Sequence, residues 1–152
     1  QGQIVTWNSD TGTPTALGSP NMAWFVGNFG GITEDGKAII VNFGDYDPDE
    51  DTYISRPYLN NKHGSFKLED VLADAGVDLT AWTFTYDEIA CATCENAGGT
   101  SVFGVSPDGS LIFGAALHEV GGNTVPEGFV VSDIPRNYLK NYKTRNKANK
   151  GK

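Results

Sequence analysis

The sequence is poor in histidine, cysteine and methionine, the side chains of zinc, copper and redox centres. It has two histidines, two cysteines and one methionine among 152 residues. It contains no apolar run of about eighteen residues, so we expect no membrane span. Its one glycine-rich stretch, at 27–31, lacks the Lys and Ser or Thr of a phosphate loop. It begins with QGQIVTW, without Met or a secretory signal, and we expect that the native N-terminus has been removed.

Positive charge is scarce outside the C-terminal end. Seven of the 11 basic residues and none of the 19 acidic ones lie in residues 136–152, which leaves a net charge of −15 on residues 1–135. Such an acidic body would repel nucleic acid and anionic membranes, although the tail could attract either or fold back on the body. We therefore expect no nucleic-acid partner.

The composition that remains favours short β-strands. Hydrophobic residues make up 39% and charged residues 20% of the chain, which is enough for a packed core. Nineteen glycines and 11% aromatic residues indicate many tight turns between strands. The length suits one domain or a piece of a larger one.

The chain carries one unit twice. GITEDGKAIIV at 31–41 and GVSPDGSLIFG at 104–114 align with an offset of 73 residues, from Gly36 to Gly109. In each unit, Asp-Gly favours a two-residue hairpin turn, and β-branched or aromatic residues follow as the return strand. We therefore predict two equivalent hairpins.

Other segments fit strands or short helices. Residues 68–76 have the spacing of an amphipathic helix that ends at Gly76, and residues 133–143 favour a second helix with Asp133 as its cap. Residues 82–90 alternate apolar and polar side chains, as a half-buried strand does. The remaining predicted strands are 3–7, 13–17, 52–59 and 128–134.

The segments QIVTWNSDTGTPTALG, GGITEDGKAIIVNFG, LEDVLADAGVDLTAWTFT, VFGVSPDGSLIFGAA and EGFVVSDIP occur in this order. Together they resemble the bacterial extracellular HAF-repeat proteins over roughly residues 3–135. The resemblance implies a secreted, cell-surface or periplasmic β-propeller of repeated antiparallel blades, and it carries over no catalytic residue.

We therefore expect an all-β fold of about two propeller-type blades with one short helix. Residues 1–135 would form the blades and residues 136–152 a basic tail. A propeller closes with roughly 4–8 blades, so two leave the ring incomplete. Exposed blade faces and strand edges favour association. Further blades of a longer chain, other protein chains or a different closed β arrangement could cover them.

The segment DYDPDED is a candidate metal site. Asp45, Asp47, Asp49 and Asp51 stand at alternate positions, which can converge on Ca²⁺ as in the first half of an EF-hand loop. The pattern lacks the later glycine and glutamate of that loop, and Arg56 stands where the glutamate would be. The alternative is a solvated acidic loop that carries no cofactor.

Cys91 and Cys94 form a C-x-x-C motif. Glu95 follows where c-type haem attachment needs histidine. A zinc site would need two more ligands, and a thioredoxin-type site would need a strand-to-helix context. The interpretation we favour is a local disulfide in an exported protein, with two free thiols as the alternative.

The basic tail interleaves charges with tyrosines, and this pattern suits a polyanion or an acidic neighbouring subunit. A solvated terminal extension is the alternative. His63 and His118 are expected on the surface or in hairpins, and the three tryptophans in the core, with a sugar-stacking platform as their alternative. The candidate partner-binding residues are Arg136, Tyr138, Lys140, Tyr142, Lys143 and Arg145.

These observations favour a non-enzymatic exported module that presents a surface for binding or assembly with other protein chains. One alternative is a structural subunit of an extracellular filament whose blades are completed by neighbours. Another is a hydrolase or lyase of extracellular polymers with a metal-assisted acidic site, which would need two carboxylates with separated pKa values in one cleft.

Overall fold

The computed structural model describes residues 4–17, 26–47, 52–84, 86–87 and 100–144. These residues form eleven strands and two short helices. In chain order the elements are β1 (Val5–Trp7), β2 (Pro14–Ala16), β3 (Val26–Ile32), β4 (Ala38–Asp47), β5 (Thr52–Asn61), β6 (Gly64–Lys67), α1 (Leu68–Asp74), β7 (Trp82–Thr83), β8 (Tyr86–Asp87), β9 (Ser101–Val105), β10 (Ile112–Val120), β11 (Asn123–Val131) and α2 (Tyr138–Asn141).

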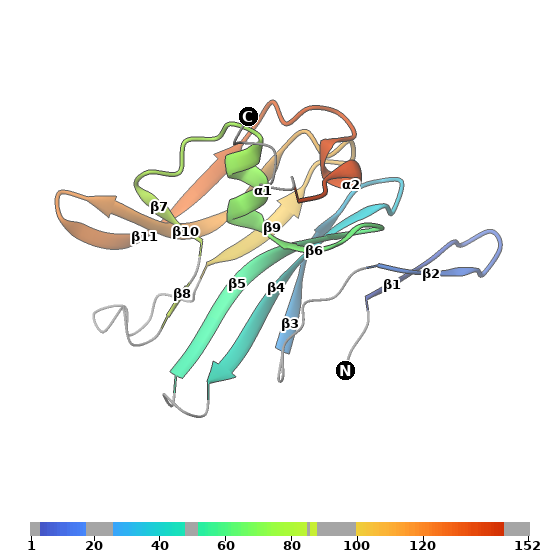
Figure 1. The fold of residues 1–152 in the computed structure, drawn as a ribbon, viewed down its shortest axis with the longest axis horizontal. Coiled ribbons are helices and arrows are strands. Elements are labelled where there is room, and N and C mark those ends of the chain that lie inside the picture. Colours follow the sequence, from blue (N-terminus) through green and yellow to red (C-terminus); the bar gives the residue numbers. More distant parts are fainter. Residues whose placement is uncertain (1–3, 18–25, 48–51, 85, 88–99, 145–152) are drawn as a thin grey trace, which may run out of the picture.

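The strands form three antiparallel sheets (Figure 1). β1 and β2 make a hairpin that protrudes from the body. The first sheet has the order β3-β4-β5-β6, and β8 also pairs with β5. In the second sheet, β10 pairs with β11 on one side and with both β9 and β7 on the other. The predicted all-β, antiparallel architecture is confirmed, and the chain also has two short helices.

The two copies of the repeat form equivalent hairpins, β3–β4 and β9–β10. In the first, the Thr33 N–H donates to the carbonyl of Ala38, and Gly36 closes a turn onto Thr33. In the second, Ser106 and Leu111 make the same pair, and Gly109 closes the turn. Four residues separate each pair, so the predicted two-residue turn is wrong. The glycines still hold the left-handed positions, with φ of 67° at Gly36 and 74° at Gly109.

The two hairpins also share a β-bulge. Gly31 pairs with Ile40 and Phe29 with Val41, so Gly30 is an extra residue. In the second hairpin Gly104 pairs with Phe113 and Val102 with Gly114, so Phe103 is the extra residue. Gly30 and Phe103 are 73 residues apart, the same offset as the repeat. The equivalence therefore extends beyond the turn motif into the pairing of the strands.

The core lies between the two main sheets. Alternation along β4 divides the first sheet into an Ile40 face, which carries Ala38, Ile40 and Asn42, and an Ile39 face, which carries Ile39, Val41 and Phe43. Alternation along β10 gives the second sheet an Ile112 face, with Ile112, Gly114 and Ala116, and a Phe113 face, with Phe113, Ala115 and Leu117. Ala38, Ile40, Ile112 and Ala116 all belong to the buried core cluster. The Ile40 face therefore packs on the Ile112 face.

Glycines allow the two sheets to approach closely. A Cβ atom on Gly30 would lie 3.2 Å from the Cβ of Val102, and one on Gly31 would lie 2.8 Å from the side chain of Val105. The Asn42 amide, on the Ile40 face, donates to the carbonyl of Val102 at 3.0 Å and accepts from its N–H at 2.8 Å. This pair of bonds satisfies the free backbone edge of β9 within the core.

Helix α1 covers one end of this core, as the apolar spacing predicts. Leu68, Val71 and Leu72 are buried, and the chain leaves the helix through Gly76, whose φ is 90°. The helix ends at Asp74, two residues before the predicted end. None of the described helices is long and apolar enough to span a membrane.

The predicted continuous strand at 82–90 is wrong in its described part. Trp82 and Thr83 pair with β10 in the second sheet, whereas Tyr86 and Asp87 pair with β5 in the first. Between them the Phe84 side chain is 2% exposed and makes an edge contact with Phe129. Insertion of this ring into the core carries the chain from one sheet to the other.

The predicted helix at 133–143 is also wrong over its first half. Asp133 has a φ of 59° and Asn137 a φ of 68°, and α2 begins only at Tyr138. The Ile134 N–H instead donates to the carbonyl of Ser110, which fixes this segment beside the second repeat turn. The left-handed backbone at Asp133 and Asn137 prevents the helix from starting at Asp133, where the sequence predicts its start.

Candidate functional site

Several predicted site residues lie outside the described part of the chain. These are Asp49, Asp51, Cys91, Cys94 and Arg145. Asp45 and Asp47 belong to strand β4 by their backbone, but their side chains are not described. No group of three or more metal-ligating side chains gathers among the described residues. The calcium site and the disulfide stay predictions.

The first residues of the predicted tail pack on the body. The Tyr138 hydroxyl donates to the carbonyl of Val71 at 2.8 Å, and the Tyr142 hydroxyl donates to Asp74 at 2.7 Å. The buried Asn61 amide donates to the carbonyls of Leu139 and Tyr142 at 2.8 and 3.0 Å. Both tyrosines of the proposed partner-binding set are thus engaged within the chain, while Arg136 and Lys143 remain at the surface.

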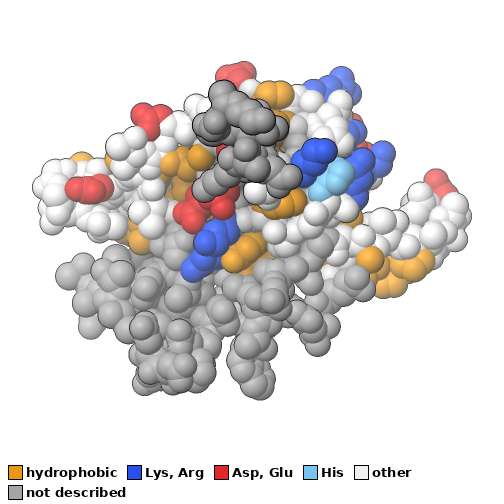
Figure 2. Space-filling model, viewed as in Figure 1, with side chains coloured by type: hydrophobic (Ala, Val, Ile, Leu, Met, Phe, Trp, Pro, Cys, Tyr) orange, Lys and Arg blue, Asp and Glu red, His pale blue; other side chains and the backbone are white. Residues whose placement is uncertain are grey.

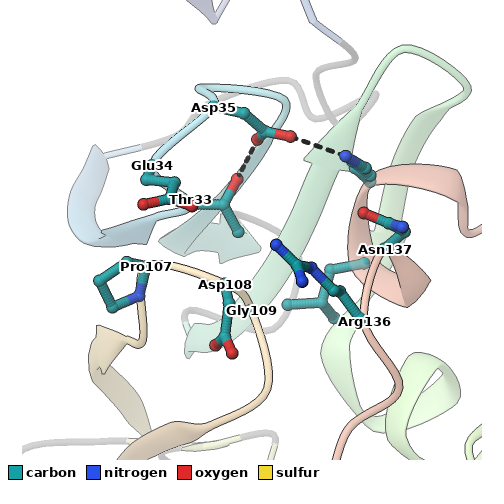
Figure 3. A pocket seen from close by; sticks show the side chains of 10 residues that line it. Thr33, Glu34, Asp35, Pro107, Asp108, Gly109, Arg136 and Asn137 are labelled. Carbon is teal, nitrogen blue, oxygen red and sulfur yellow. Dashed lines mark hydrogen bonds and ion pairs between the residues drawn. The ribbon is translucent and has the colours of Figure 1, made fainter.

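The two repeat turns meet the segment before α2 around a small hollow. The Glu34 N–H donates to the carbonyl of Pro107 at 2.8 Å, so equivalent positions of the two repeats touch each other. Arg136 and Asn137 project towards both turns (Figure 3). The hollow has a volume of about 60 Å³. Its lining residues are Thr33, Glu34, Asp35, Pro107, Asp108, Gly109, Arg136, Asn137, Leu139 and Lys140.

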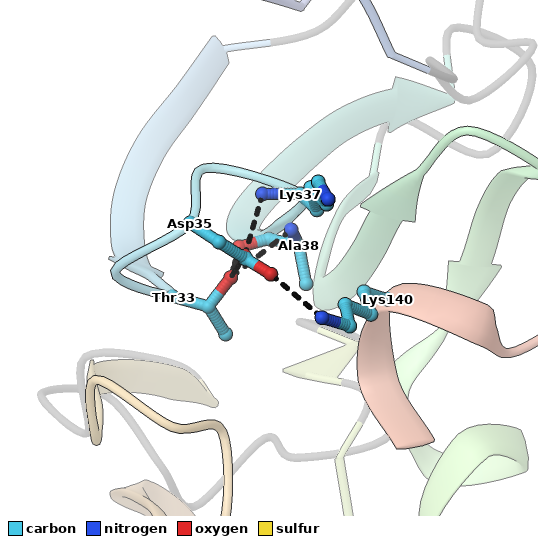
Figure 4. A network of polar contacts seen from close by, with 5 residues as sticks. All are labelled: Thr33, Asp35, Lys37, Ala38 and Lys140. Carbon is cyan, nitrogen blue, oxygen red and sulfur yellow. Dashed lines mark hydrogen bonds and ion pairs between the residues drawn. The ribbon is translucent and has the colours of Figure 1, made fainter. Parts of the chain in front are cut away.

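Asp35 is the centre of a polar network at this hollow (Figure 4). Its carboxylate accepts hydrogen bonds from the Thr33 hydroxyl at 2.9 Å and the Lys37 N–H at 3.1 Å, and it pairs with the Lys140 ammonium at 2.9 Å. Partial burial alone would raise the pKa of Asp35, but the bonds from Lys140, Lys37 and Thr33 outweigh it and lower the pKa to about 2.

Asp108 repeats this arrangement in the second turn. It accepts from the Ser110 hydroxyl at 2.7 Å, the Ser110 N–H at 3.0 Å and the Ser106 hydroxyl at 2.9 Å. The two Ser110 bonds and then the Ser106 bond lower the pKa of Asp108 to about 2. Each carboxylate therefore stays ionised at neutral pH and holds its own turn in shape.

A second polar cluster lies at the edge of the second sheet. His118 Nδ1 is 2.6 Å from the Glu127 carboxylate, and the Trp82 ring stacks on the imidazole with 4.2 Å between centroids and 4° between planes. The sequence alone predicts His118 only as a surface or hairpin residue. The register that sets Trp82 opposite His118 joins segments 36 residues apart, and no local pattern indicates it.

Five of the large exposed apolar side chains lie on the outer sheet faces. Phe103, Phe113 and Val130 lie on the Phe113 face, where their exposed fractions are 64%, 43% and 67%. On the Ile39 face, the exposed large apolar residues lie on β3, where Phe29 is 67% and Ile32 38% exposed, whereas Ile39 and Phe43 on β4 are 6% and 1% exposed. Exposed apolar patches of this kind are typical of contact sites in proteins.

A groove runs between the Ile39 face and the protruding hairpin. Trp7 on β1 is 68% exposed and borders this groove opposite Phe29 and Ile32. The groove has a volume of about 890 Å³. Figure 2 shows hydrophobic side chains along the hairpin arm. None of the residues of β1 and β2 is buried. A two-stranded hairpin with so little buried surface is only marginally stable in water.

Comparison with known proteins found no match: no family model, no curated protein and no solved structure is similar to this chain.

Proposed function

We propose that this chain is a non-enzymatic, exported β-repeat module of propeller-type blades that works by docking other protein chains on its apolar sheet faces. The observation that carries the proposal is the Phe113 face. Phe103, Phe113 and Val130 are the exposed large apolar side chains there, and each is at least 43% exposed. Aromatic and aliphatic anchors of this kind dominate the energetics of protein interfaces.

The polymer-hydrolase alternative gains no support from the described carboxylates. Glycosidase-type acid–base chemistry needs one carboxyl whose pKa is raised beside another that stays ionised. At the hollow between the turns, the pKa values of Asp35 and Asp108 are both lowered to about 2. Their hydrogen bonds shape the two turns and join Asp35 to Lys140, so a structural role accounts for both carboxylates.

The proposal predicts that the exposed apolar side chains of the Phe113 face bind other proteins and contribute little to the free energy of unfolding. The double variant Phe103→Ser/Val130→Thr should bind the hydrophobic dye bis-ANS less than the native chain does, because it removes exposed apolar area. Its free energy of unfolding in urea should stay within about 1 kcal/mol of the native value, since these side chains are already in water.

The matched control is Val120→Thr, which changes an exposed apolar residue at the tip of the β10–β11 hairpin, away from this face. It should leave dye binding nearly unchanged. A loss of more than about 2 kcal/mol in the double variant would show that the face belongs to the folding core, and the docking function would then be wrong.

A further inference from the structure

Strand β11 is the outer strand of the second sheet. It pairs with β10 along its whole length, and no described strand pairs with its other edge. Gly128, in the second half of the strand, is exposed to solvent, and because glycine has no side chain, this exposure is that of its backbone. The outer edge of β11 therefore offers main-chain hydrogen-bonding groups to water or to a partner.

The turn between β10 and β11 decides which backbone groups point outward. Gly121 and Gly122 form a two-residue loop between the paired residues Val120 and Asn123, and their φ values of 58° and 82° fit a type I′ turn. The pair that flanks such a loop exchanges two hydrogen bonds, and hydrogen-bonded pairs then alternate along the antiparallel ladder. The even-numbered residues of β11 therefore direct their main-chain groups away from β10.

Two observations agree with this alternation. The Glu119 N–H donates to the carbonyl of Ala81 at 2.8 Å, on the side of β10 away from β11, so Thr124, the register partner of Glu119, faces outward. Pro126 has no N–H and occupies an outward position, where the ladder to β10 loses no bond. Beyond the proline, the outward N–H groups and carbonyls have no backbone partner among the described residues.

An apolar pocket opens beside these outward groups. It lies where the segment between α1 and β7 passes beside β11, and its volume is about 280 Å³ (Figure 1). Leu79, Trp82 and Phe129 line it together with Gly128 and Val130 of the outer edge itself. An added strand would thus find main-chain partners and a pocket for one of its alternate side chains, which are the two parts of recognition by β-strand addition.

The exposed charges around this edge are negative. Asp78 lines the pocket, Glu127 lies within β11 beside His118, and Asp133 follows the end of the strand. Hydrogen bonds from the hydroxyl and the N–H of Thr80 lower the pKa of Asp78, which keeps it ionised at neutral pH. A second copy of the chain would bring the same acidic residues to this edge, whereas a strand with basic ends would meet opposite charge.

We propose that the outer edge of β11, at Gly128 and Val130, binds an extended segment of another protein by β-strand addition. One large apolar side chain of that segment occupies the pocket beside Leu79 and Phe129, and its ends are basic. The proposal rests on the proposed docking function, and it adds the manner of docking and the chemical class of the partner. The main-chain bonds supply affinity, while the pocket and the acidic residues select the side chains.

A synthetic peptide of the sequence Lys-Thr-Val-Phe-Val-Thr-Lys, with blocked ends and a fluorescent label, tests the proposal on the full chain. Fluorescence anisotropy measures its binding. Two control peptides keep every side chain: one is N-methylated at both valines, and the other at the phenylalanine. In an antiparallel or parallel strand only one of these two sets of N–H groups faces β11. One control peptide should therefore bind about tenfold more weakly or worse, and the other nearly as well as the parent peptide.

Protein variants locate the site on β11. Val130→Pro removes an outward N–H without removing a bond to β10, so it should weaken peptide binding about tenfold. Thr124→Pro makes the same change near the hairpin turn, away from the pocket, and is the matched control. Asp78→Asn keeps a side-chain oxygen for Thr80 but removes the charge, so it should weaken binding less and reduce its dependence on salt. Circular dichroism and urea unfolding verify the fold of each variant.

Several results would overturn the proposal. The parent peptide could fail to bind at millimolar concentration, or both methylated peptides could bind as well as the parent. Equal loss with both would mean that the N–H groups on one side of the peptide do not matter specifically. If sedimentation velocity showed native dimers that Val130→Pro abolishes, a second copy would occupy the edge instead. The docking function would stand in each of these cases if the bis-ANS and unfolding results of the Phe113 face were as expected.

Discussion

At the scale of single residues, Gly114 sets how closely β9 and β10 can pack. A Cβ atom there would overlap the carbonyl oxygen of Ser101 and lie 2.9 Å from the Cα of Val102. Both neighbours are backbone atoms in a buried part of the sheet, and backbone cannot rotate away as a side chain can. Gly114→Ala should therefore lower the free energy of unfolding by about 1 to 3 kcal/mol, measured by urea denaturation.

Gly128 on β11 is the control. It pairs with Ala115, the residue that follows Gly114 on β10. The nearest atom to a Cβ at Gly128 is 3.8 Å away, an ordinary contact distance. Gly128→Ala should change the stability by less than about 0.5 kcal/mol or raise it slightly, because alanine restricts the unfolded chain. Equal losses at the two positions would contradict the close approach of β9 and β10.

The Asp35–Lys140 pair makes a prediction about pH. The pKa of Asp35 is lowered to about 2, so the ionised pair stabilises the fold above the ordinary carboxyl pKa, and this contribution is lost as the pH falls from about 4 towards 2. Lys140→Met should raise the Asp35 pKa, which NMR titration of its carboxyl carbon would follow. The stability change should be below about 1 kcal/mol, because the pair is partly exposed to solvent.

Asp108 is the internal control for this titration, since none of the described lysines pairs with it. Its pKa should stay near 2 in Lys140→Met. A parallel rise at Asp108 would mean that a general loss of structure, and not the missing ammonium, moves both groups.

At the scale of elements, α2 is held by its tyrosines rather than by helix propensity. It has four residues, no side-chain cap and a left-handed residue before it. The Tyr142 side chain is 6% exposed, and burial, followed by the hydrogen bond to Asp74, raises its pKa. Tyr142→Phe should cost about 1 kcal/mol at pH 7, measured by urea unfolding.

The same variant has a distinct alkaline signature. A tyrosine whose pKa is raised on folding stabilises the protein fully below pH 10 and loses this effect as the pH rises towards the folded pKa. The native chain should therefore lose more stability above pH 10 than Tyr142→Phe does. Identical alkaline profiles for the two proteins would show that the Tyr142 hydroxyl does not report the docking of α2.

Elements with strong local signals could be predicted from the sequence, and the others could not. The spacing of Leu68, Val71 and Leu72 indicates α1, and the two Asp-Gly units indicate their hairpins. β6 has only four residues, and its pairing with β5 adds no distinctive pattern. The interruption at Phe84 depends on which sheet each flank joins, which is a long-range choice that residues 82–90 do not encode alone.

The same limit applies to the candidate sites. The doubled Asp-Gly unit indicates two turns, but it does not say that Glu34 and Pro107 meet. The alternation of Phe113 with its neighbours indicates a two-faced strand without saying which face is covered. Both facts follow from the way the sheets stack, and only the assembled fold shows it. The predicted tail likewise gave no sign that Tyr138 and Tyr142 bond to α1.

At the scale of the whole molecule, both sheets depend on one shared core. Ile40 of the first sheet and Ile112 of the second are at most 1% exposed and belong to the same cluster. Ile40→Ala should lower the global stability by about 2 to 5 kcal/mol, because it removes buried methyl groups from the contact between the sheets. Hydrogen exchange read by mass spectrometry should lose protection equally in β4 and β10. Loss confined to β3–β6 would mean that the sheets unfold separately.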